Sequence, residues 1–253
     1  MPHLSMTDNA RLMSVARASL SGCWQSAALV TALSALILMA CHLLPVFGSL
    51  AQLLLIGPLQ LGLARYLLQT VRGGRPSTSV LFSGFDQFGR ALAVYLLSML
   101  LMALPMVLLV SVYWGVAAAL GVPSGESAMH SIAAAVAFCA VFSIWLALCT
   151  FIWIALGMSY FILVDAPQTG AVAALRQSRA MMRGNMRKFF ALVCRFTGWF
   201  LLCLVTFGIA SFWVYPYFAA ASIHFYEEIR DRPAAPEARA AGGEPFAYID
   251  FGD

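Results

Sequence analysis

The residues that could carry out catalysis are few in this chain, and they stand far apart. Its four histidines, at positions 3, 42, 130 and 224, have no spacing that would bring two of them onto one metal ion. No Ser-His-acid set or phosphate-binding loop accompanies the carboxylates that precede the C-terminal end, which are Asp8, Asp86, Glu126 and Asp165. The sequence therefore predicts a protein that is not an enzyme and has no metal or cofactor.

The six cysteines, at positions 23, 41, 139, 149, 194 and 203, suggest no chemistry either. They lie in or beside apolar stretches and show no CxxC spacing. Such cysteines are predicted to be small buried apolar side chains rather than metal ligands or a disulfide framework.

The composition indicates the environment in which these residues stand. Hydrophobic residues make up 62% of the 253 positions and charged residues 10%, and the mean hydropathy is +0.84. Soluble domains carry about a quarter charged residues, because polar groups have to cover their surface. A chain this poor in charge is predicted to be a multi-pass membrane protein.

Long charge-free stretches locate the membrane spans. A helix needs about 20 apolar residues to cross the hydrocarbon core. The favoured prediction is an all-α transmembrane helix bundle of about six spans, at 23–44, 48–70, 91–119, 131–163, 189–208 and 211–229. An alternative divides 91–164 into four short spans at Pro105 and near Thr150, which gives eight spans in all.

The basic residues set the orientation, because Lys and Arg accumulate in cytoplasmic loops. With the N-terminus inside, all fifteen Lys and Arg fall on the cytoplasmic side or at its interface. Both termini are therefore predicted to be cytoplasmic. The chain divides into a cytoplasmic segment 1–22, a transmembrane domain 23–229 and a tail 230–253, whose Pro, Ala and Gly content predicts disorder.

Arg65 and Arg195 fall inside predicted spans, where ionisable residues are candidates for function. One interpretation is that both side chains snorkel to the cytoplasmic surface. The other is that they pair with Asp86 and Asp165 and fix the cytoplasmic segments across the bundle. Two glutamines in span two could face a polar cavity with these arginines or hydrogen-bond between helices: Gln52 and Gln60.

Two amphipathic helices are predicted at the cytoplasmic interface. The first follows Ser77 and spaces three phenylalanines three residues apart, at 82, 85 and 88. The second runs from Pro167 to Gly184, and its basic face would attract anionic lipid headgroups. The surface is too small for nucleic acid. The predicted membrane-surface basic residues are Arg176, Arg179, Arg183, Arg187 and Lys188.

The motif GPLQLG (57–62) in span two combines small residues with a proline. It predicts either close helix packing or a kink that lines a substrate path. All predicted helix-break or packing positions are Gly57, Pro58, Gly62, Gly84, Pro167, Gly184 and Pro216.

Three stretches carry a resemblance: GPLQLGLARYLLQTVRGGRPSTSVLFSGFDQFGRAL (57–92), ILVDAPQTGAVAALRQSRAMMRGNMRKFFAL (162–192) and GWFLLCLVTFGIASFWVYPYFAAASIHFYEEI (198–229). They resemble the bacterial integral-membrane family known as domain of unknown function 975 and, more loosely, the YciC-like membrane proteins. Positions that fit the pattern are Gly57, Pro58, Gly62, Phe82, Gly84, Phe85, Asp165, Pro167, Ser178, Met182, Gly184, Gly198, Trp199, Pro216, Tyr217, Phe225 and Tyr226.

One departure from the family pattern concerns the segment 148–165. The family has a Pro-Gly break shortly before its Asp-x-Pro turn, and this segment contains no proline. The resemblance therefore does not carry a hinge over to this chain. It implies a fold and a location in the bacterial inner membrane, without a substrate or an activity.

Two classes of function follow from the sequence. The favoured one is a non-enzymatic scaffold, immunity or stress-related factor that acts through a membrane protein partner or a second copy. The alternative is binding or translocation of a lipidic or amphiphilic small molecule through the bundle. Translocation predicts a polar cavity lined by Gln52, Gln60, Arg65 and Arg195, whereas a scaffold predicts a closed apolar core.

Overall fold

The computed structural model describes residues 8–43, 47–119 and 132–231, and all regular structure in these ranges is helical. This confirms the all-α prediction for the described part of the chain. The helices are α1 (Asn9–Ser19), α2 (Trp24–Cys41), α3 (Gly48–Val71), the 3-10 helix η1 (Thr78–Gln87), α4 (Phe88–Ala119), α6 (Ile132–Leu156), α7 (Ser159–Asp165), α8 (Ala171–Met182), α9 (Met186–Arg195), α10 (Thr197–Val205) and α11 (Ser211–Arg230). The tail beyond residue 231 lies outside the described residues.

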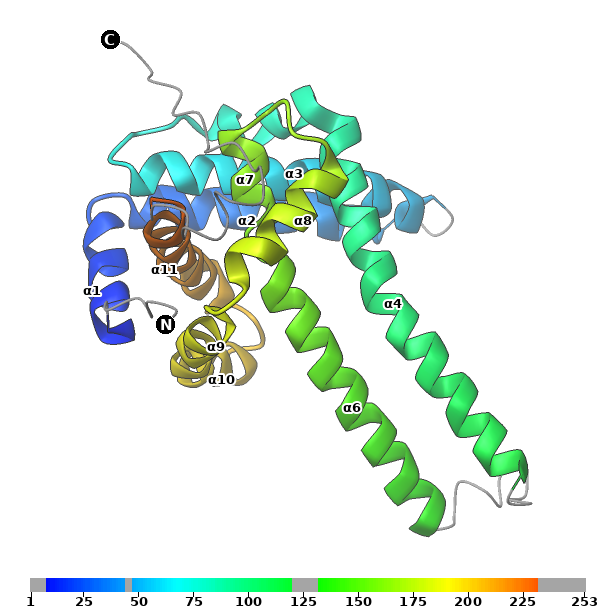
Figure 1. Ribbon diagram of the computed structural model, residues 1–253. Coiled ribbons are helices and arrows are strands. Elements are labelled where there is room, and N and C mark those ends of the chain that lie inside the picture. The colour runs from blue at the N-terminus through cyan, green and yellow to red at the C-terminus, as the bar shows by residue number, and fades with distance from the viewer. Residues whose placement is uncertain (1–7, 44–46, 120–131, 232–253) are drawn as a thin grey trace, which may run out of the picture.

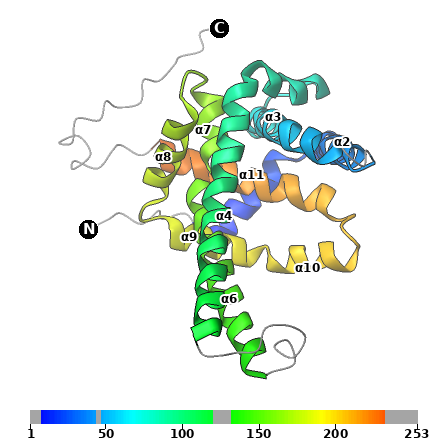
Figure 2. The same ribbon diagram turned by 90° about the vertical axis from the view of Figure 1, so that its right-hand side faces the viewer.

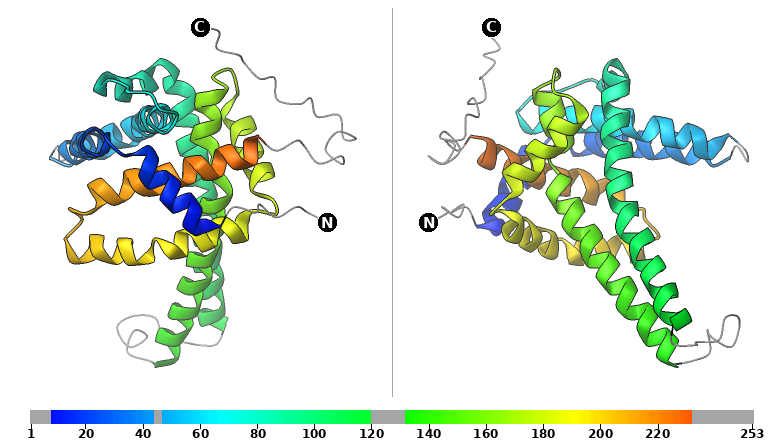
Figure 3. Two further views of the ribbon diagram at one scale, coloured as in Figure 1. Left: turned by 90° about the vertical axis from the view of Figure 1, so that its left-hand side faces the viewer. Right: turned by 45° about the vertical axis from the view of Figure 1, so that its right-hand side comes forward.

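The long helices form three hairpins that diverge from one hub (Figures 1 and 2). Helix α2 pairs with α3, α4 pairs with α6, and α10 pairs with α11. The α4–α6 hairpin extends in a different direction from the other two (Figure 3). The hub consists of α1, η1, α7 and α8, together with the ends of α3, α4 and α11 that pack on them.

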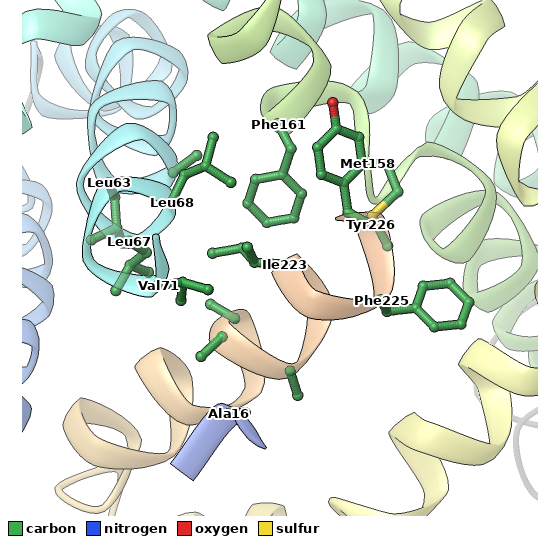
Figure 4. Close-up of a cluster of buried hydrophobic side chains, with 14 of the residues drawn as sticks. Ala16, Leu63, Leu67, Leu68, Val71, Met158, Phe161, Ile223, Phe225 and Tyr226 are labelled. Atoms are coloured by element: carbon green, nitrogen blue, oxygen red, sulfur yellow. The ribbon is translucent and has the colours of Figure 1, made fainter. Parts of the chain in front are cut away.

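The buried core lies in the hub. The last turns of α11 bring Ile223, Phe225 and Tyr226 against α3 and the α6–α7 junction (Figure 4). Phe161 of α7 lies next to the Tyr226 ring, with 5.7 Å between the centroids. Burial of one large apolar side chain stabilises a fold by about 1.5–3 kcal/mol. The hub therefore holds the helices together.

Four helical segments are long and apolar enough to cross a membrane: α2, α3, Thr78–Gly115 and Val136–Asp165. Helices α9 and α10, which bend by 41° at their junction, would add a fifth. These lengths and compositions are those of a membrane protein. Helix α11, the predicted sixth span, is not among the helices that are long and apolar enough to cross a membrane.

Helices α3, α4 and α6 run on through their potential breaks. Helix α4 continues through Pro105, α6 through Thr150 and α3 through Pro58. The alternative division into eight spans is therefore wrong. A proline removes only one backbone donor, and neighbouring groups can compensate for this loss in a membrane helix.

The helix is broken between α6 and α7, although this segment contains no proline. Helix α6 ends at Leu156 and α7 begins at Ser159. The Met158 N–H donates to Ser178 Oγ of α8 at 3.2 Å, and the Ser178 hydroxyl donates to the Ala155 carbonyl at 2.9 Å. Ser178 is fully buried. One hydroxyl thus bonds two backbone groups at the break.

The second predicted interfacial helix starts later than expected. Helix α8 begins at Ala171, not at Pro167, because the chain first forms a turn in which the Thr169 N–H donates to the Ala166 carbonyl at 2.9 Å. Pro167 lies in the connecting turn, and its carbonyl accepts a hydrogen bond from Arg90 at the start of α4. The predicted C-terminal turn is present, and Gly184 has φ +85° there.

The first predicted interfacial segment is η1, and it docks on α3 through glycines. A Cβ atom at Gly62 would lie 1.8 Å from the Leu81 carbonyl oxygen, and one at Gly84 would lie 2.0 Å from the Pro58 carbonyl oxygen. Only glycine permits this approach of two backbones. At GPLQLG the backbones of α3 and η1 are therefore in close contact.

Candidate functional site: the charged hub around Asp165

Asp165 is the last residue of α7, and its carboxylate lies between α3 and α11. Arg72, directly after α3, donates from Nη1 to Oδ1 at 2.9 Å and from Nη2 to Oδ2 at 3.0 Å. From α11, Arg230 Nη1 and the Tyr226 hydroxyl donate to Oδ2 at 2.8 and 3.0 Å. Because α7 extends α6, this one carboxylate links all three hairpins.

A second layer of charges surrounds this carboxylate. Arg72 Nε also donates to Glu227 at 3.0 Å, and Arg230 Nε donates to Asp231 at 2.9 Å. On the other side of α11, Lys188 Nζ of α9 lies 3.1 Å from Glu228. The Asp165 network therefore connects α3, α7 and α11, and the Lys188–Glu228 pair joins α9 to α11.

Burial and ion pairing shift the pKa of Arg72 in opposite directions. Burial alone would lower the pKa of its guanidinium, but the hydrogen bonds to Asp165 and Glu227 outweigh burial and raise that pKa above its ordinary value. The Asp165 side chain is only 11% exposed. A carboxylate this buried is stable as an ion only with such partners.

The arrangement is suited to holding helices together. Arg72 donates through Nε, Nη1 and Nη2, Arg230 donates through Nε and Nη1, and the acceptors are Asp165 and neighbouring acids. Within the described ranges there is no group of three or more His, Cys, Asp or Glu residues that could hold a metal ion. The hydrogen bonds and ion pairs of Asp165 join α3, α7 and α11.

The structure corrects one predicted ion pair. Arg195 does not reach Asp165; its Nη2 lies 3.6 Å from Asp8 in front of α1, and both side chains are exposed. The reason is that Arg195 ends α9, which packs on α1, whereas Asp165 ends α7, which packs on α3.

The other predicted pair, Arg65 and Asp86, is brought together only loosely. Arg65 Nη1 lies 3.9 Å from Asp86 Oδ2, and the Asp86 side chain is 75% exposed. The firmer contact of Arg65 is a hydrogen bond of 3.1 Å to the Ser83 carbonyl of η1. Arg65 thus fastens η1 to α3.

The two glutamines do not join these arginines. Gln60 accepts a hydrogen bond of 3.3 Å from the Tyr215 hydroxyl of α11. Gln52 is half-buried and lies nearer the start of α3. Since Arg65 contacts η1 and Arg195 contacts Asp8, no hydrogen bond or ion pair within the described residues joins these four side chains.

A known family model matches most of this chain. The model of the family described as "Protein of unknown function (DUF975)" matches residues 6–233, a range that contains every helix from α1 to α11. The chain belongs to this family. No curated protein and no solved structure matches it.

Asp165, Ser178 and Tyr226, which carry the resemblance in the sequence, take part in linking the hub of this DUF975 protein. Asp165 and Tyr226 make the inter-helix contacts at the end of α7, and Ser178 spans the α6–α7 break. Sequence reasoning did not find the role of Arg72, Glu227 and Arg230. The available signal was that each lies just beyond, or in the last turn of, a predicted span, where charged residues meet at one membrane face.

The basic face of α8 in the DUF975 protein is exposed. Arg176, Arg179 and Arg183 are exposed, and so is Arg187 at the start of α9. Within the described residues no ion pair engages these four arginines. Lys188 differs, because it is half-buried and pairs with Glu228.

Proposed function

We propose that this DUF975 protein is a non-enzymatic, multi-pass scaffold, immunity or stress-related factor of the bacterial inner membrane. In this proposal it acts through a membrane protein partner or a second copy, and both termini lie in the cytoplasm. The four exposed arginines of α8 and α9 rest on anionic headgroups of the cytoplasmic leaflet, each attracted by about 1 kcal/mol. Nucleic acid is not a partner.

One observation carries the proposal: the α4–α6 hairpin leaves the hub with large apolar side chains exposed on both helices. Leu108 and Val112 of α4 are 65% and 61% exposed, and Phe138 and Ile144 of α6 are 60% and 51% exposed. Lipid satisfies such a surface, and so does another apolar helix. A fixed hub with an extended apolar hairpin is suited to presenting that hairpin to a partner.

Crossing the membrane is proposed for α2, α3, α4 and α6–α7. Helix α10 is nine residues long, about 14 Å at 1.5 Å per residue. In α11 only Ser211–Ile223 precedes the polar hub end, about 20 Å. Both are shorter than the hydrocarbon core of about 30 Å. We therefore propose that the α10–α11 hairpin enters from the cytoplasmic side without crossing, in place of the fifth and sixth spans.

Site-specific photocrosslinking in native membranes tests the scaffold function. A benzophenone amino acid would replace Leu108 or Phe142 on the hairpin, and Val172, which is exposed on α8, as the matched control. We expect a discrete protein adduct from the hairpin positions and none from Val172. Only lipid adducts from the hairpin would contradict the scaffold and favour the alternative, a protein that binds or translocates a lipidic molecule.

A further inference from the structure

A pocket of about 220 Å³ lies between α1, α2, α10 and α11, away from the Asp165 network. Its lining is mostly aromatic and includes one charged residue. The lining residues are Arg17, Trp24, Trp199, Trp213, Val214 and Tyr217.

The pocket carries hydrogen-bond donors that the described chain does not use. Arg17, in the last turn of α1, is exposed and makes no ion pair or hydrogen bond with a described residue. The indole N–H groups of the three lining tryptophans likewise make no hydrogen bond with a described residue. No lining residue is acidic. This chemistry favours an anionic occupant rich in acceptor oxygens, and the uncompensated guanidinium disfavours a cationic one.

The aromatic wall is already assembled around Tyr217. Its ring lies 5.9 Å from that of Trp24 and, edge-on, 6.0 Å from that of Trp199. Its hydroxyl donates to the Met13 carbonyl of α1 at 3.3 Å, which fastens α11 to the helix that bears Arg17. A ligand that enters a preformed site loses less free energy to the ordering of side chains.

The volume of the pocket and the residues around it indicate which part of a ligand would enter it. Drug-sized ligands occupy pockets of about 300–1,000 Å³, so this pocket suits a headgroup rather than a whole amphiphile. Leu201, Leu204 and Val205 of the adjoining α10 are 58%, 75% and 74% exposed and offer an apolar path for acyl chains. Tryptophan and tyrosine rings favour the headgroup level of a bilayer.

We propose that this pocket binds the phosphate headgroup of an anionic phospholipid. Arg17 binds the phosphate oxygens through two parallel N–H groups, indole N–H groups supply further donors, and the acyl chains lie along α10. This site is independent of the scaffold function, since its residues belong neither to the Asp165 network nor to the α4–α6 hairpin.

Tryptophan quenching by brominated lipids tests the proposal on the full-length protein. Phosphatidylglycerol with brominated acyl chains is titrated into phosphatidylcholine vesicles that contain the protein, and brominated phosphatidylcholine gives the reference curve. We expect a preference for phosphatidylglycerol that Arg17→Gln weakens by roughly tenfold or more, because a hydrogen-bonded charge is lost. Arg17 is exposed, so this change leaves the buried core intact.

Two further variants separate the pocket from general surface attraction. Arg11→Gln removes another exposed arginine of α1 that does not line the pocket, and we expect it to weaken the preference by no more than about fivefold. Arg17→Lys keeps the charge but loses the guanidinium fork, and we expect it to lose several-fold of the preference.

Three results would overturn the proposal. One is a wild-type protein that quenches equally with both lipids. Another is an equal effect of Arg17→Gln and Arg11→Gln with a normal Arg17→Lys variant, which would show surface charge alone. The last is release of the quenching by millimolar inorganic phosphate, which would make the soluble anion the ligand.

Discussion

Arg72 and Asp165, which are 93 positions apart in the sequence, form a pair with two parallel hydrogen bonds of 2.9 and 3.0 Å. Arg230 approaches the same carboxylate from α11 at 2.8 Å. The three residues come from three different hairpins. One largely buried acid therefore pairs with an arginine from each of the other two hairpins.

Asp165→Asn tests this pairing. The variant leaves two arginines without their carboxylate, and we expect the free energy of unfolding to fall by roughly 1–3 kcal/mol, a range that allows for the partial exposure of both guanidinium groups. Equilibrium unfolding in detergent measures the loss. Asp86→Asn is the matched control, because its carboxylate is 75% exposed and lies 3.9 Å from Arg65. Its expected change is below about 0.5 kcal/mol, and equal losses in the two variants would contradict the role of Asp165 in joining the helices.

The sequence could identify Asp165 as a site residue, but it could not identify the partners. An isolated acid at the end of an apolar stretch stands out, because a charge is costly at that depth. The choice between Arg72 and Arg195 depends on which helix ends meet in space. Both arginines lie at the ends of helices, so spacing along the chain did not separate them.

The helices themselves were more predictable than their breaks. The absence of charge located α2, α3, α4 and α6, because long apolar stretches admit few other structures. The break after Leu156 was not predictable from local propensity, since a hydroxyl on α8 stabilises it from outside the helix. The pocket beside Arg17 likewise depends on α1 and α11 meeting, which no local pattern records.

Ser178→Ala tests that break. The change leaves the Met158 N–H and the Ala155 carbonyl buried without their partner, and we expect a loss of about 1–3 kcal/mol in the free energy of unfolding. Ser143→Ala is the control, because this exposed hydroxyl bonds only to the Cys139 carbonyl of its own helix at 2.7 Å. We expect the control to change stability by less than about 0.5 kcal/mol. Similar values for the two variants would show that the hydroxyl bridge is dispensable.

Gly62→Ala tests the docking of η1 on α3. The new methyl group would meet the Leu81 carbonyl, a backbone atom that cannot rotate away, so η1 would have to move. We expect a loss of stability of roughly 1–3 kcal/mol or more and faster proteolysis of 78–87. Gly89→Ala, at the start of α4, has no heavy atom within 4 Å of the added Cβ and is expected to be neutral or slightly stabilising. Normal protease resistance in Gly62→Ala would contradict the close contact.

The depth of the α10–α11 hairpin gives a test of topology. In a variant whose native cysteines are replaced, Ser211→Cys places a thiol at the tip of this hairpin. We expect a membrane-impermeant maleimide added to the outside of intact spheroplasts to leave this thiol unlabelled, because the hairpin covers only about two thirds of the 30 Å hydrocarbon core. Ser127→Cys, in the predicted outer loop 121–130, is the positive control and should react. Labelling of both positions would show that α10 and α11 cross the membrane and would restore the six-span arrangement.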